Sequence, residues 1–543
     1  MVIGLWFYPC ALSMGLMLWA TPNTALMTRF AVAALCSLSF STGLVLIYRA
    51  LPAAALRRFV GLTSLALLCL YTFSLGFHFW HYGQLFGVTT LYSILESTSA
   101  ETSEYLRSVT RLDVLAFAFV LTLPLLLSFK AVNVWLGSSA RRKPVSMAMG
   151  LILLGVSTAI TLPRPNLQSH NPWLFISNGA QEAFAQRAMI RAVYATMQHS
   201  APAVAQARSN EPATHILIIG ESTTSKHMSL YGYARKTTPK LDAMRPSLQI
   251  VRDACSSRGN TAESLKEMLT FATRDRPELL FERPNLIQLM NSAGFRTYWL
   301  SNQQKVGNSD SWSEILSSAA STRSFVNRRG WTDGISLDDG LLPELTKALA
   351  DSANKRFIVV HLLGTHAAYA LRYPSAFKVF DNRTDVHPNV LRQSTGVRGW
   401  LFNSVLSQFN DYDNAVLYND HMVASIIAAT KDTPQVSVTY LSDHGESLGE
   451  QDDFLGHIDG PAPKQVYQIP LFFYVAPQLR ASLGSRLESL HQNLAKPFQS
   501  DQLVHSLLDL YGVEHSYADP QRSLVNPAFV PVKRFCDTLA AVN

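Results

Sequence analysis

The first 163 residues contain five long apolar stretches, and no other feature of the sequence limits the fold as strongly. The stretches run over roughly residues 3–20, 30–48, 59–80, 114–136 and 144–163. Each is close to the ~20 residues that an α-helix needs to cross a bilayer, and a soluble domain built from them would have almost no polar surface. We therefore predict an α-helical membrane domain of five transmembrane helices. The first stretch could instead be a cleaved signal peptide, but no basic segment precedes it.

The distribution of charge predicts how these helices are oriented. Of the formal net charge of +7, residues 1–163 contribute +6, from 10 Lys/Arg and 4 Asp/Glu, and residues 164–543 contribute +1. Six of the basic residues lie in two connections, at 49–58 and 141–143. Because basic loops stay in the cytoplasm, we expect residue 164 to emerge outside, which places the C-terminal part in the periplasm. That part is nearly neutral, so we expect no binding to nucleic acid.

A second domain follows a linker. Pro163 and Pro165 end the last span, and a helical pattern follows over 173–199, so we predict a bridging helix and linker over residues 164–213. In residues 214–543 short apolar runs alternate with helix-like stretches, which is typical of an α/β domain with a mainly parallel sheet. The predicted strands are His215–Ile219, Arg296–Leu300, Phe357–Val360, Val436–Leu441 and Leu471–Val475. The predicted helices are Thr261–Phe271, Leu286–Ala293, Leu341–Ala350, Tyr418–Ala429 and Asp501–Tyr511.

Polar side chains follow several of these strands, where α/β folds bind their ligands. Glu221 follows the first predicted strand, and Asp443 and His444 follow the fourth. Taken singly, Glu221 could cap a helix and His444 could be a hydrogen-bonded core residue. Together they are oxygen and nitrogen donors of the kind that bind Zn²⁺ or Mn²⁺. The sequence therefore predicts a metal site at this edge of the sheet.

Several motifs resemble those of one known family, the bacterial phosphoethanolamine transferases of the alkaline phosphatase and sulfatase superfamily. The motifs are Gly220–Thr224, Met228–Tyr233, Thr237–Pro239, His361–His366, Arg372–Pro374, Tyr412–Asn414 and Ser442–Ser447. With the five spans, the resemblance covers nearly the whole chain. It implies a sulfatase-like catalytic domain in the periplasm and an anchor in a bacterial inner membrane. It also implies transfer of phosphoethanolamine from phosphatidylethanolamine to a lipopolysaccharide acceptor.

The resemblance also implies roles for individual residues. It makes Glu221, Thr261, Asp443 and His444 the metal set, with Thr261 as the nucleophile that forms a phosphothreonine intermediate. This is chemically reasonable, because a hydroxyl needs a base or a metal to become a good nucleophile. On its own, Thr261 could equally be a helix N-cap. His366 and His457 match histidines near the phosphoryl group.

Other residues are predicted to bind substrate. Thr98, Ser99 and Glu101 match a loop that faces the lipid headgroup, although this acidic segment could also be a solvated turn. Asn302 and Lys305 follow the second predicted strand at the same edge as the metal set. We expect phosphatidylethanolamine and lipopolysaccharide as partners, contact with membrane lipid, and a monomer.

The cysteines separate this chain from many relatives, which carry several disulfides. Of its five cysteines, only Cys255 and Cys536 lie outside the predicted spans. At most one bridge is possible between them, and their spacing says nothing about its geometry, so we expect the core to supply the stability. This scarcity, with Ser301–Gln304 and Gly364–His366, looks more like the branch that acts on the core heptose of lipopolysaccharide.

Other functions fit parts of the same pattern. They are a lipid A phosphoethanolamine transferase, a glycerophosphate transferase or phosphodiesterase of the same superfamily, and a non-catalytic envelope protein that binds lipid. Transport is disfavoured, because the spans contain no buried acid and no broken pair of segments.

Overall fold

A computed structural model describes residues 8, 11–12, 15, 24–51, 53–82, 118–119, 122–123, 127, 144–163, 172–199, 204–304, 311–327, 335–395, 405–433, 435–451, 454–460 and 462–539. The chain forms two compact units, residues 1–96 with 109–185 and residues 97–108 with 186–543. The last boundary between them lies within helix α10 (Pro172–His199), where the sequence predicts a bridging helix.

Three helices of the first unit are long and apolar enough to cross a membrane. They are α2 (Thr24–Ala50), α3 (Ala54–Tyr82) and α8 (Pro144–Thr161), with candidate spans Ala31–Ala50, Ala54–Gly76 and Pro144–Thr161. Three of the five predicted helices are thereby confirmed. The predicted helices at 3–20 and 114–136 lie largely outside the described residues.

Helices α2 and α8 pack against each other through small residues. A Cβ atom on Gly43 would lie 2.8 Å from the carbonyl oxygen of Gly150, and the same holds in reverse. The Ser157 hydroxyl donates a hydrogen bond of 2.7 Å to the carbonyl of Cys36. Small residues let helix backbones approach closely, and hydroxyls then bond across the interface, as in membrane helix pairs.

The second unit is built around an eight-stranded sheet with the order β11-β3-β10-β7-β2-β6-β4-β5. The strands are β2 (Ala213–Gly220), β3 (Leu248–Cys255), β4 (Arg296–Ser301), β5 (Thr322–Phe325), β6 (Lys355–His361), β7 (Val436–Ser442), β10 (Gln468–Val475) and β11 (Phe498–Gln499). Strand β10 runs antiparallel to both neighbours, and the other neighbouring pairs are parallel. The predicted α/β class and mainly parallel sheet are therefore confirmed.

All five predicted strands exist, but three strands of the eight-stranded sheet were missed. Strand β3 carries Arg252 and Asp253 and has only a partly buried pattern, so it lacks the continuous apolar run that marks the others. Strands β5 and β11 are short. Two small ribbons complete the strands, β1 (Ala205–Ala207) with β12 (Val513–His515) and β8 (Ser447–Leu448) with β9 (Leu455–Gly456).

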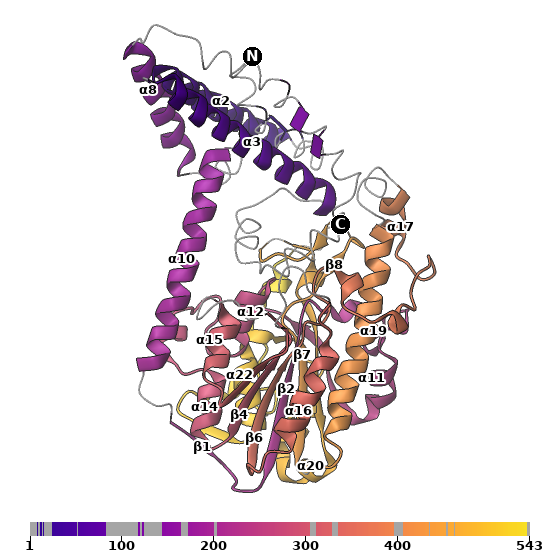
Figure 1. The fold of residues 1–543 in the computed structure, drawn as a ribbon. Helices are drawn as coiled ribbons and strands as arrows, with labels where there is room; N and C mark the ends of the chain where they lie inside the picture. The colour runs from indigo at the N-terminus through magenta and orange to yellow at the C-terminus, as the bar shows by residue number, and fades with distance from the viewer. Residues whose placement is uncertain are drawn as a thin grey trace. The chain divides into compact units, whose positions relative to one another are not determined.

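Helices cover both faces of the sheet (Figure 1). They are α11 (Pro239–Met244), α12 (Thr261–Met268), α13 (Leu279–Glu282), α14 (Leu286–Ser292), α15 (Trp312–Ser318), α16 (Leu341–Leu349), α17 (Pro388–Thr395), α19 (Val405–Ala429), α20 (Pro477–Leu483), α21 (Ser485–Asn493) and α22 (Leu503–Leu510). Leu217 and Ile219 of β2 share one buried core with residues of α14 and α22. On the opposite face, Asn419 of α19 donates a hydrogen bond of 2.7 Å to the hydroxyl of Tyr440 on β7. The sheet is thus the middle layer of three.

A disulfide joins Cys255, at the end of β3, to Cys536, 281 residues later in the sequence. Both residues are buried in a cluster with Tyr467 and Val466. The expectation that the core alone stabilises this domain is therefore corrected, because a covalent link also closes a long loop. It ties the C-terminal segment to the strand that leads into the loop before Thr261.

Candidate metal and nucleophile site

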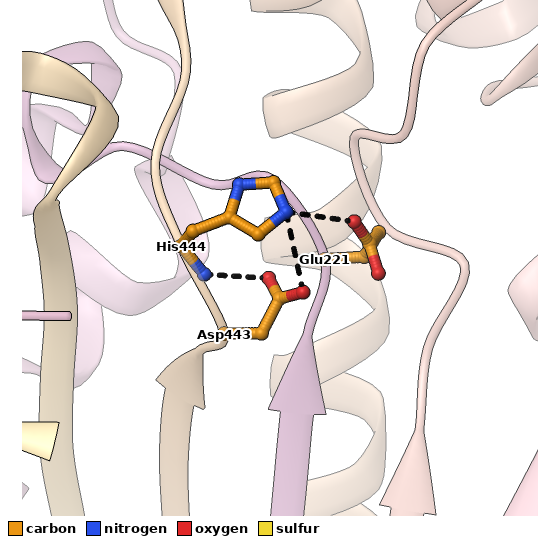
Figure 2. A group of neighbouring side chains, drawn as sticks. All are labelled: Glu221, Asp443 and His444. Carbon is orange, nitrogen blue, oxygen red and sulfur yellow. Dashed lines mark hydrogen bonds and ion pairs between the residues drawn. The ribbon is translucent and has the colours of Figure 1, made fainter. Parts of the chain in front are cut away.

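The register of two parallel strands brings the predicted metal ligands together. Strands β2 and β7 are neighbours, and their last residues, Gly220 and Ser442, are paired. Glu221 and Asp443 therefore leave the sheet side by side, and His444 follows directly (Figure 2). Ligand atoms of Glu221, Asp443 and His444 all lie within 4.8 Å of one another, and all three residues are buried. The convergence predicted from the sequence is confirmed for these three side chains.

The hydrogen bonds of Asp443 leave one oxygen open toward a ligand. Its Oδ1 accepts hydrogen bonds from the backbone N–H groups of Ser222 (3.0 Å) and His444 (2.7 Å). Its Oδ2 is buried and has no hydrogen-bond partner among the described residues, and it lies 3.4 Å from Nε2 of His444. A buried carboxylate oxygen without a donor is costly, and a cation at this position would satisfy it.

The ring of His444 is oriented in the way a metal ligand requires. Its Nδ1 lies 2.9 Å from the carbonyl oxygen of Gly445. A carbonyl can only accept, so Nδ1 carries the proton, and in the neutral ring Nε2 presents its lone pair. Nε2 also lies 3.4 Å from Oε1 of Glu221 (Figure 2). A tetrahedral zinc site uses nitrogen and carboxylate donors of this kind, so the residues fit a zinc ion.

Thr261 completes the group from the start of helix α12. Asn260 is the N-cap, and its side chain accepts a hydrogen bond from the N–H of Glu263. Thr261 is thus the first helical residue, not the cap. Its hydroxyl lies 3.0 Å and 3.2 Å from the two carboxylate oxygens of Glu221 and 3.3 Å from Nε2 of His444. The cap leaves this hydroxyl free for the cluster.

The electrostatics of the cluster show an excess of negative charge. Burial and the neighbouring Glu221 raise the pKa of Asp443 to about 7. Burial lowers the pKa of His444, but Asp443 and Glu221 outweigh it and raise the pKa to about 10. For Glu221, burial raises the pKa, and the hydrogen bond and charge of His444 bring it below the usual range. The two buried carboxylates share the single positive charge of His444, and this favours a divalent ion at the site.

The loop after β2 is held in a rarely populated conformation. Ser222 has a φ of 54°, in the left-handed region, and its N–H bonds to Asp443. The hydroxyl of Tyr412 donates to the carbonyl of Ser222 (2.7 Å) and accepts from the N–H of Thr224 (2.9 Å). Such backbone strain is found at functional sites, where surrounding contacts impose it.

A neighbouring glycine lets a second loop approach. Gly364 has a φ of 51°, and a Cβ atom there would lie 2.9 Å from the backbone nitrogen of Glu221. The hydroxyl of Thr365 donates a hydrogen bond of 2.9 Å to the carbonyl of Glu221. This packing places His366, the next residue, at the site.

His366 and His457 lie near the metal ligands. The charge of each acts on Glu221 and lowers its pKa. Nδ1 of His366 is buried without a hydrogen-bond partner among the described residues. The ring of His457 lies 4.1 Å from the ring of His444, centre to centre, and its Nδ1 lies 3.1 Å from Oε2 of the buried Glu446.

Gln303 is a site residue that the sequence analysis did not single out. Its amide nitrogen donates hydrogen bonds to Oε2 of Glu221 (3.1 Å) and to the carbonyl of Leu362 (3.0 Å). The neighbouring Asn302, predicted to bind substrate, uses its amide differently. It donates to Asp338 (2.8 Å) and accepts from Ser336 (2.6 Å). The signal was the position directly after β4, which fits Gln303 as well as Asn302.

The remaining predicted substrate residues, Thr98, Ser99, Glu101 and Lys305, lie outside the described residues.

A second buried carboxylate–histidine cluster lies beside the first and follows the same strand, β2. His227 bonds through Nδ1 to Asp413 (2.6 Å) and through Nε2 to Glu450. Oδ2 of Asp413 accepts from Arg235 (2.8 Å) and from the hydroxyl of Tyr233 (3.0 Å). Burial lowers the pKa of His227, but the two carboxylates raise it to about 10. We call this group the closed cluster.

The sulfatase family model matches residues 213–513 of this chain. Phosphoethanolamine transferase EptC of Escherichia coli strain K12 is 32% identical over 494 residues, which cover 87% of this chain and 82% of that protein. Phosphoethanolamine transferase CptA of Salmonella typhimurium is 30% identical and covers 84% of this chain and 80% of its own length. The Kdo(2)-lipid A phosphoethanolamine 7''-transferase of E. coli is 27% identical over 50% of this chain and 46% of its own.

Two solved structures are similar to this chain, one over its C-terminal domain and one over almost its whole length. The C-terminal periplasmic domain of E. coli EptC in complex with zinc has a TM-score of 0.57 at 33% identity and covers 63% of this chain and 98% of that one. The integral membrane lipooligosaccharide phosphoethanolamine transferase A of Neisseria meningitidis has a TM-score of 0.69 at 19% identity and covers 96% and 97%. The second likeness extends the shared fold to the membrane region.

Proposed function

We propose the function of this chain from its family, because the chain belongs to the phosphoethanolamine transferases of the sulfatase family. It transfers phosphoethanolamine from phosphatidylethanolamine to a lipopolysaccharide acceptor in the bacterial envelope. Residues 1–163 anchor it in the inner membrane, residues 164–213 bridge, and residues 214–543 form the catalytic domain in the periplasm. The zinc-bound periplasmic domain of EptC, 33% identical, supports this arrangement.

One observation carries the proposal, namely that the hydroxyl of Thr261 sits within the group of metal donors. It lies 3.0 Å from Glu221 and 3.3 Å from Nε2 of His444. Glu221, Asp443, His444 and Thr261 would hold a zinc ion, which supplies Lewis-acid chemistry and lowers the pKa of a hydroxyl that it binds. The same donors accept Mn²⁺, so metal analysis of the purified protein decides between the two.

The reaction proceeds in two displacements at phosphorus. In the first, the Thr261 oxygen forms a bond to the phosphorus of phosphatidylethanolamine, and the bond to the diacylglycerol oxygen breaks. Glu221 accepts the hydrogen bond of the Thr261 hydroxyl, the proton of this hydroxyl is released as the new bond forms, and the leaving diacylglycerol oxygen takes up a proton. In the second, an acceptor oxygen attacks the phosphothreonine and loses its proton, the Thr261–phosphorus bond breaks, and the Thr261 oxygen takes up a proton again.

His366 and His457 are suited to move these protons and to stabilise negative charge on the phosphoryl oxygens. His457 is oriented by Glu446 at 3.1 Å, and His366 follows the loop that packs on Glu221. Thr98, Ser99 and Glu101 bind the ethanolamine headgroup, and Lys305 contributes to the substrate site. Asn302, whose amide is bonded to Asp338 and Ser336, contributes to this site by holding the loop after β4. The protein acts as a monomer.

We further propose that the acceptor is a core heptose of lipopolysaccharide. Ser301–Gln304 and Gly364–His366 resemble the branch that acts on core heptose, and the match with the Kdo(2)-lipid A enzyme extends over only half of this chain. Mass spectrometry of lipopolysaccharide from cells with and without the protein, with lipid A and core separated, tests this directly. Phosphoethanolamine found on lipid A alone would overturn the choice of acceptor.

The transfer mechanism is tested by replacing the nucleophile. Purified Thr261→Ala is expected to lose at least about 1,000-fold of its transfer from a fluorescent phosphatidylethanolamine, and mass spectrometry should find no modified threonine. Thr270→Ala is the matched control, because its buried hydroxyl bonds away from the metal donors, donating to the carbonyl of Lys266 at 2.7 Å and accepting from the N–H of Ala272 at 3.1 Å. If Thr261→Ala kept transferring the group, the mechanism would be wrong.

A further inference from the structure

Two loops that are distant in sequence meet at a single carboxylate beside the site. One loop, residues 257–260, precedes the nucleophile Thr261. The other carries His457 and, two residues later, Asp459. Oδ1 of Asp459 accepts a hydrogen bond of 3.1 Å from the backbone N–H of Gly259, two residues before Thr261. On its own loop, Asp459 therefore follows His457 by two residues. On the other loop, it bonds to Gly259, which precedes Thr261 by two residues.

Two arginines complete the contacts of Asp459. Arg258 donates to Oδ2 at 3.1 Å, and Arg274 donates to Oδ1 at 2.8 Å. Both arginines also hold the nucleophile loop or its helix. Arg274 donates to the carbonyl of Ser257 at 2.7 Å, and Arg258 pairs with the buried Glu267 of α12 at 2.7 Å. The side chains of Asp459 and Arg258 are only 16% and 15% exposed, so these charge-assisted bonds are little screened by solvent.

The backbones of the two loops also touch without an intervening side chain. A Cβ atom on Gly259 would lie 2.2 Å from the carbonyl oxygen of Ile458. On the far side, the hydroxyl of Tyr467 accepts a hydrogen bond of 2.8 Å from the N–H of Gly460. The loop around Asp459 is thus held from behind, and the nucleophile loop rests directly on it.

A side chain from each of the two loops lies close to the imidazole of His444. The hydroxyl of Thr261 lies 3.3 Å from Nε2 of His444, and the ring of His457 lies 4.1 Å from the ring of His444. We propose that Asp459 is a positioning residue that fixes Thr261 relative to His457 during phosphoryl transfer. This inference rests on the proposed function, because both residues act in that reaction. A misplacement of about 1 Å between reacting groups can cost about 100-fold in rate.

The test compares Asp459→Ala with the full-length parent protein in detergent. We expect kcat for transfer from fluorescent phosphatidylethanolamine to fall by about 100-fold, while KM changes by less than about threefold, because the substrate groups remain in place. Asp253→Ala is the matched control, because it removes a carboxylate that pairs with Arg534 at 2.9 Å in the same domain but touches neither loop. It should keep the parental kcat.

A second readout does not depend on activity. Hydrogen exchange of the zinc-free protein should show faster exchange at the Gly259 amide in Asp459→Ala and not in Asp253→Ala. Asp459→Asn, which can still accept from Gly259 but cannot pair with two guanidinium groups, should lie between Ala and the parent in kcat. The proposal is overturned if kcat stays within about threefold of the parent, or if it falls only in proportion to lost zinc or lost folded protein. A parent protein that fails to transfer would instead contradict the proposed function, and hydrogen exchange would still report on the loops.

Discussion

The metal and nucleophile site and the closed cluster are built from the same residue types but differ in how completely they are satisfied. Both are buried, both combine two carboxylates with a histidine, and both follow strand β2. In the closed cluster, Oδ1 and Oδ2 of Asp413 and both oxygens of Glu450 have donors. In the metal site, Oδ2 of Asp443 has none among the described residues.

The charges differ in the same way. In the closed cluster, His227 and Arg235 balance Asp413 and Glu450, so burial leaves no net charge. In the metal site, Glu221 and Asp443 both lie within ion-pair distance of His444, and no arginine or lysine among the described residues pairs with either of them. Residue type alone therefore does not separate the two clusters. They differ in that a carboxylate oxygen of the candidate metal site has no donor among the described residues, and a bound cation would satisfy it.

The largest expected effect concerns the metal and nucleophile site. Asp443→Asn should bind no zinc and should lose at least about 1,000-fold of transfer activity, because it removes a metal ligand. The Tm of the zinc-free variant should stay near or above that of the zinc-free parent, because the substitution removes one of two repelling buried carboxylates. Metal analysis, a transfer assay and thermal unfolding measure the three quantities. Normal zinc content in the variant would remove Asp443 from the site.

The closed cluster should respond in the opposite manner, with a loss of stability and no loss of zinc. Asp413→Ala leaves His227 and Arg235 without their shared buried carboxylate, and breaking a buried ion pair in this way costs about 3–5 kcal/mol. Thermal unfolding of the full-length protein in detergent should show a clear fall in Tm, with zinc still bound to the fraction that is folded. If Asp413→Ala lost zinc but kept its Tm, the two clusters would not be separate units.

The sequence alone placed the metal ligands but not this difference between the clusters. Glu221, Asp443 and His444 could be found because each directly follows an apolar run, and parallel strands end at one edge. The strand order and register, with Gly220 beside Ser442, could not be read from the sequence, because they depend on long-range pairing. His227 has no local pattern at all, since its partners lie 186 and 223 residues away.

The fold shows the same limit. Continuous apolar runs marked β2, β4, β6, β7 and β10, whereas β3 is only partly buried and carried no such signal. The link between Cys255 and Cys536 depends on where the C-terminal segment returns, and spacing does not report this. Gln303 was hidden by its neighbour, because position after a strand does not determine which of two amides turns toward Glu221.

A pH experiment on the zinc-free protein sharpens the comparison further. Burial and Glu221 raise the pKa of Asp443 to about 7, far above the value of about 3.9 in an unfolded chain. The stability from this group is complete below that unfolded value and is lost as the pH rises through 7. The Tm of the zinc-free parent should therefore be higher at pH 5.5 than at pH 8, and Asp443 alone should contribute about 2 kcal/mol to this difference.

The closed cluster adds to this slope with the same sign. Burial lowers the pKa of His227, but Asp413 and Glu450 raise it to about 10, so the folded protein keeps this proton while the unfolded chain loses it above about pH 6.5. Asp443→Asn should remove only the part of the slope that Asp443 contributes, and saturating zinc should remove that part too, because the metal stabilises the ionised ligand. An unchanged slope in zinc-free Asp443→Asn would show that Asp443 does not titrate in this range.

The smallest expected effect concerns one amide on each side. Gln303→Ala removes a hydrogen bond of 3.1 Å to Glu221, and a bond to a charged group contributes about 1.5 kcal/mol, so transfer should fall about tenfold. Asn410→Ala is its counterpart in the closed cluster, where Asn410 accepts from Arg235 at 2.8 Å. It should lower Tm slightly and leave kcat unchanged, because Arg235 keeps Asp413. Equal losses of kcat in both variants would contradict a specific role of Gln303 at the metal site. A loss of kcat in Gln303→Ala alone would support its role in holding Glu221 for the metal.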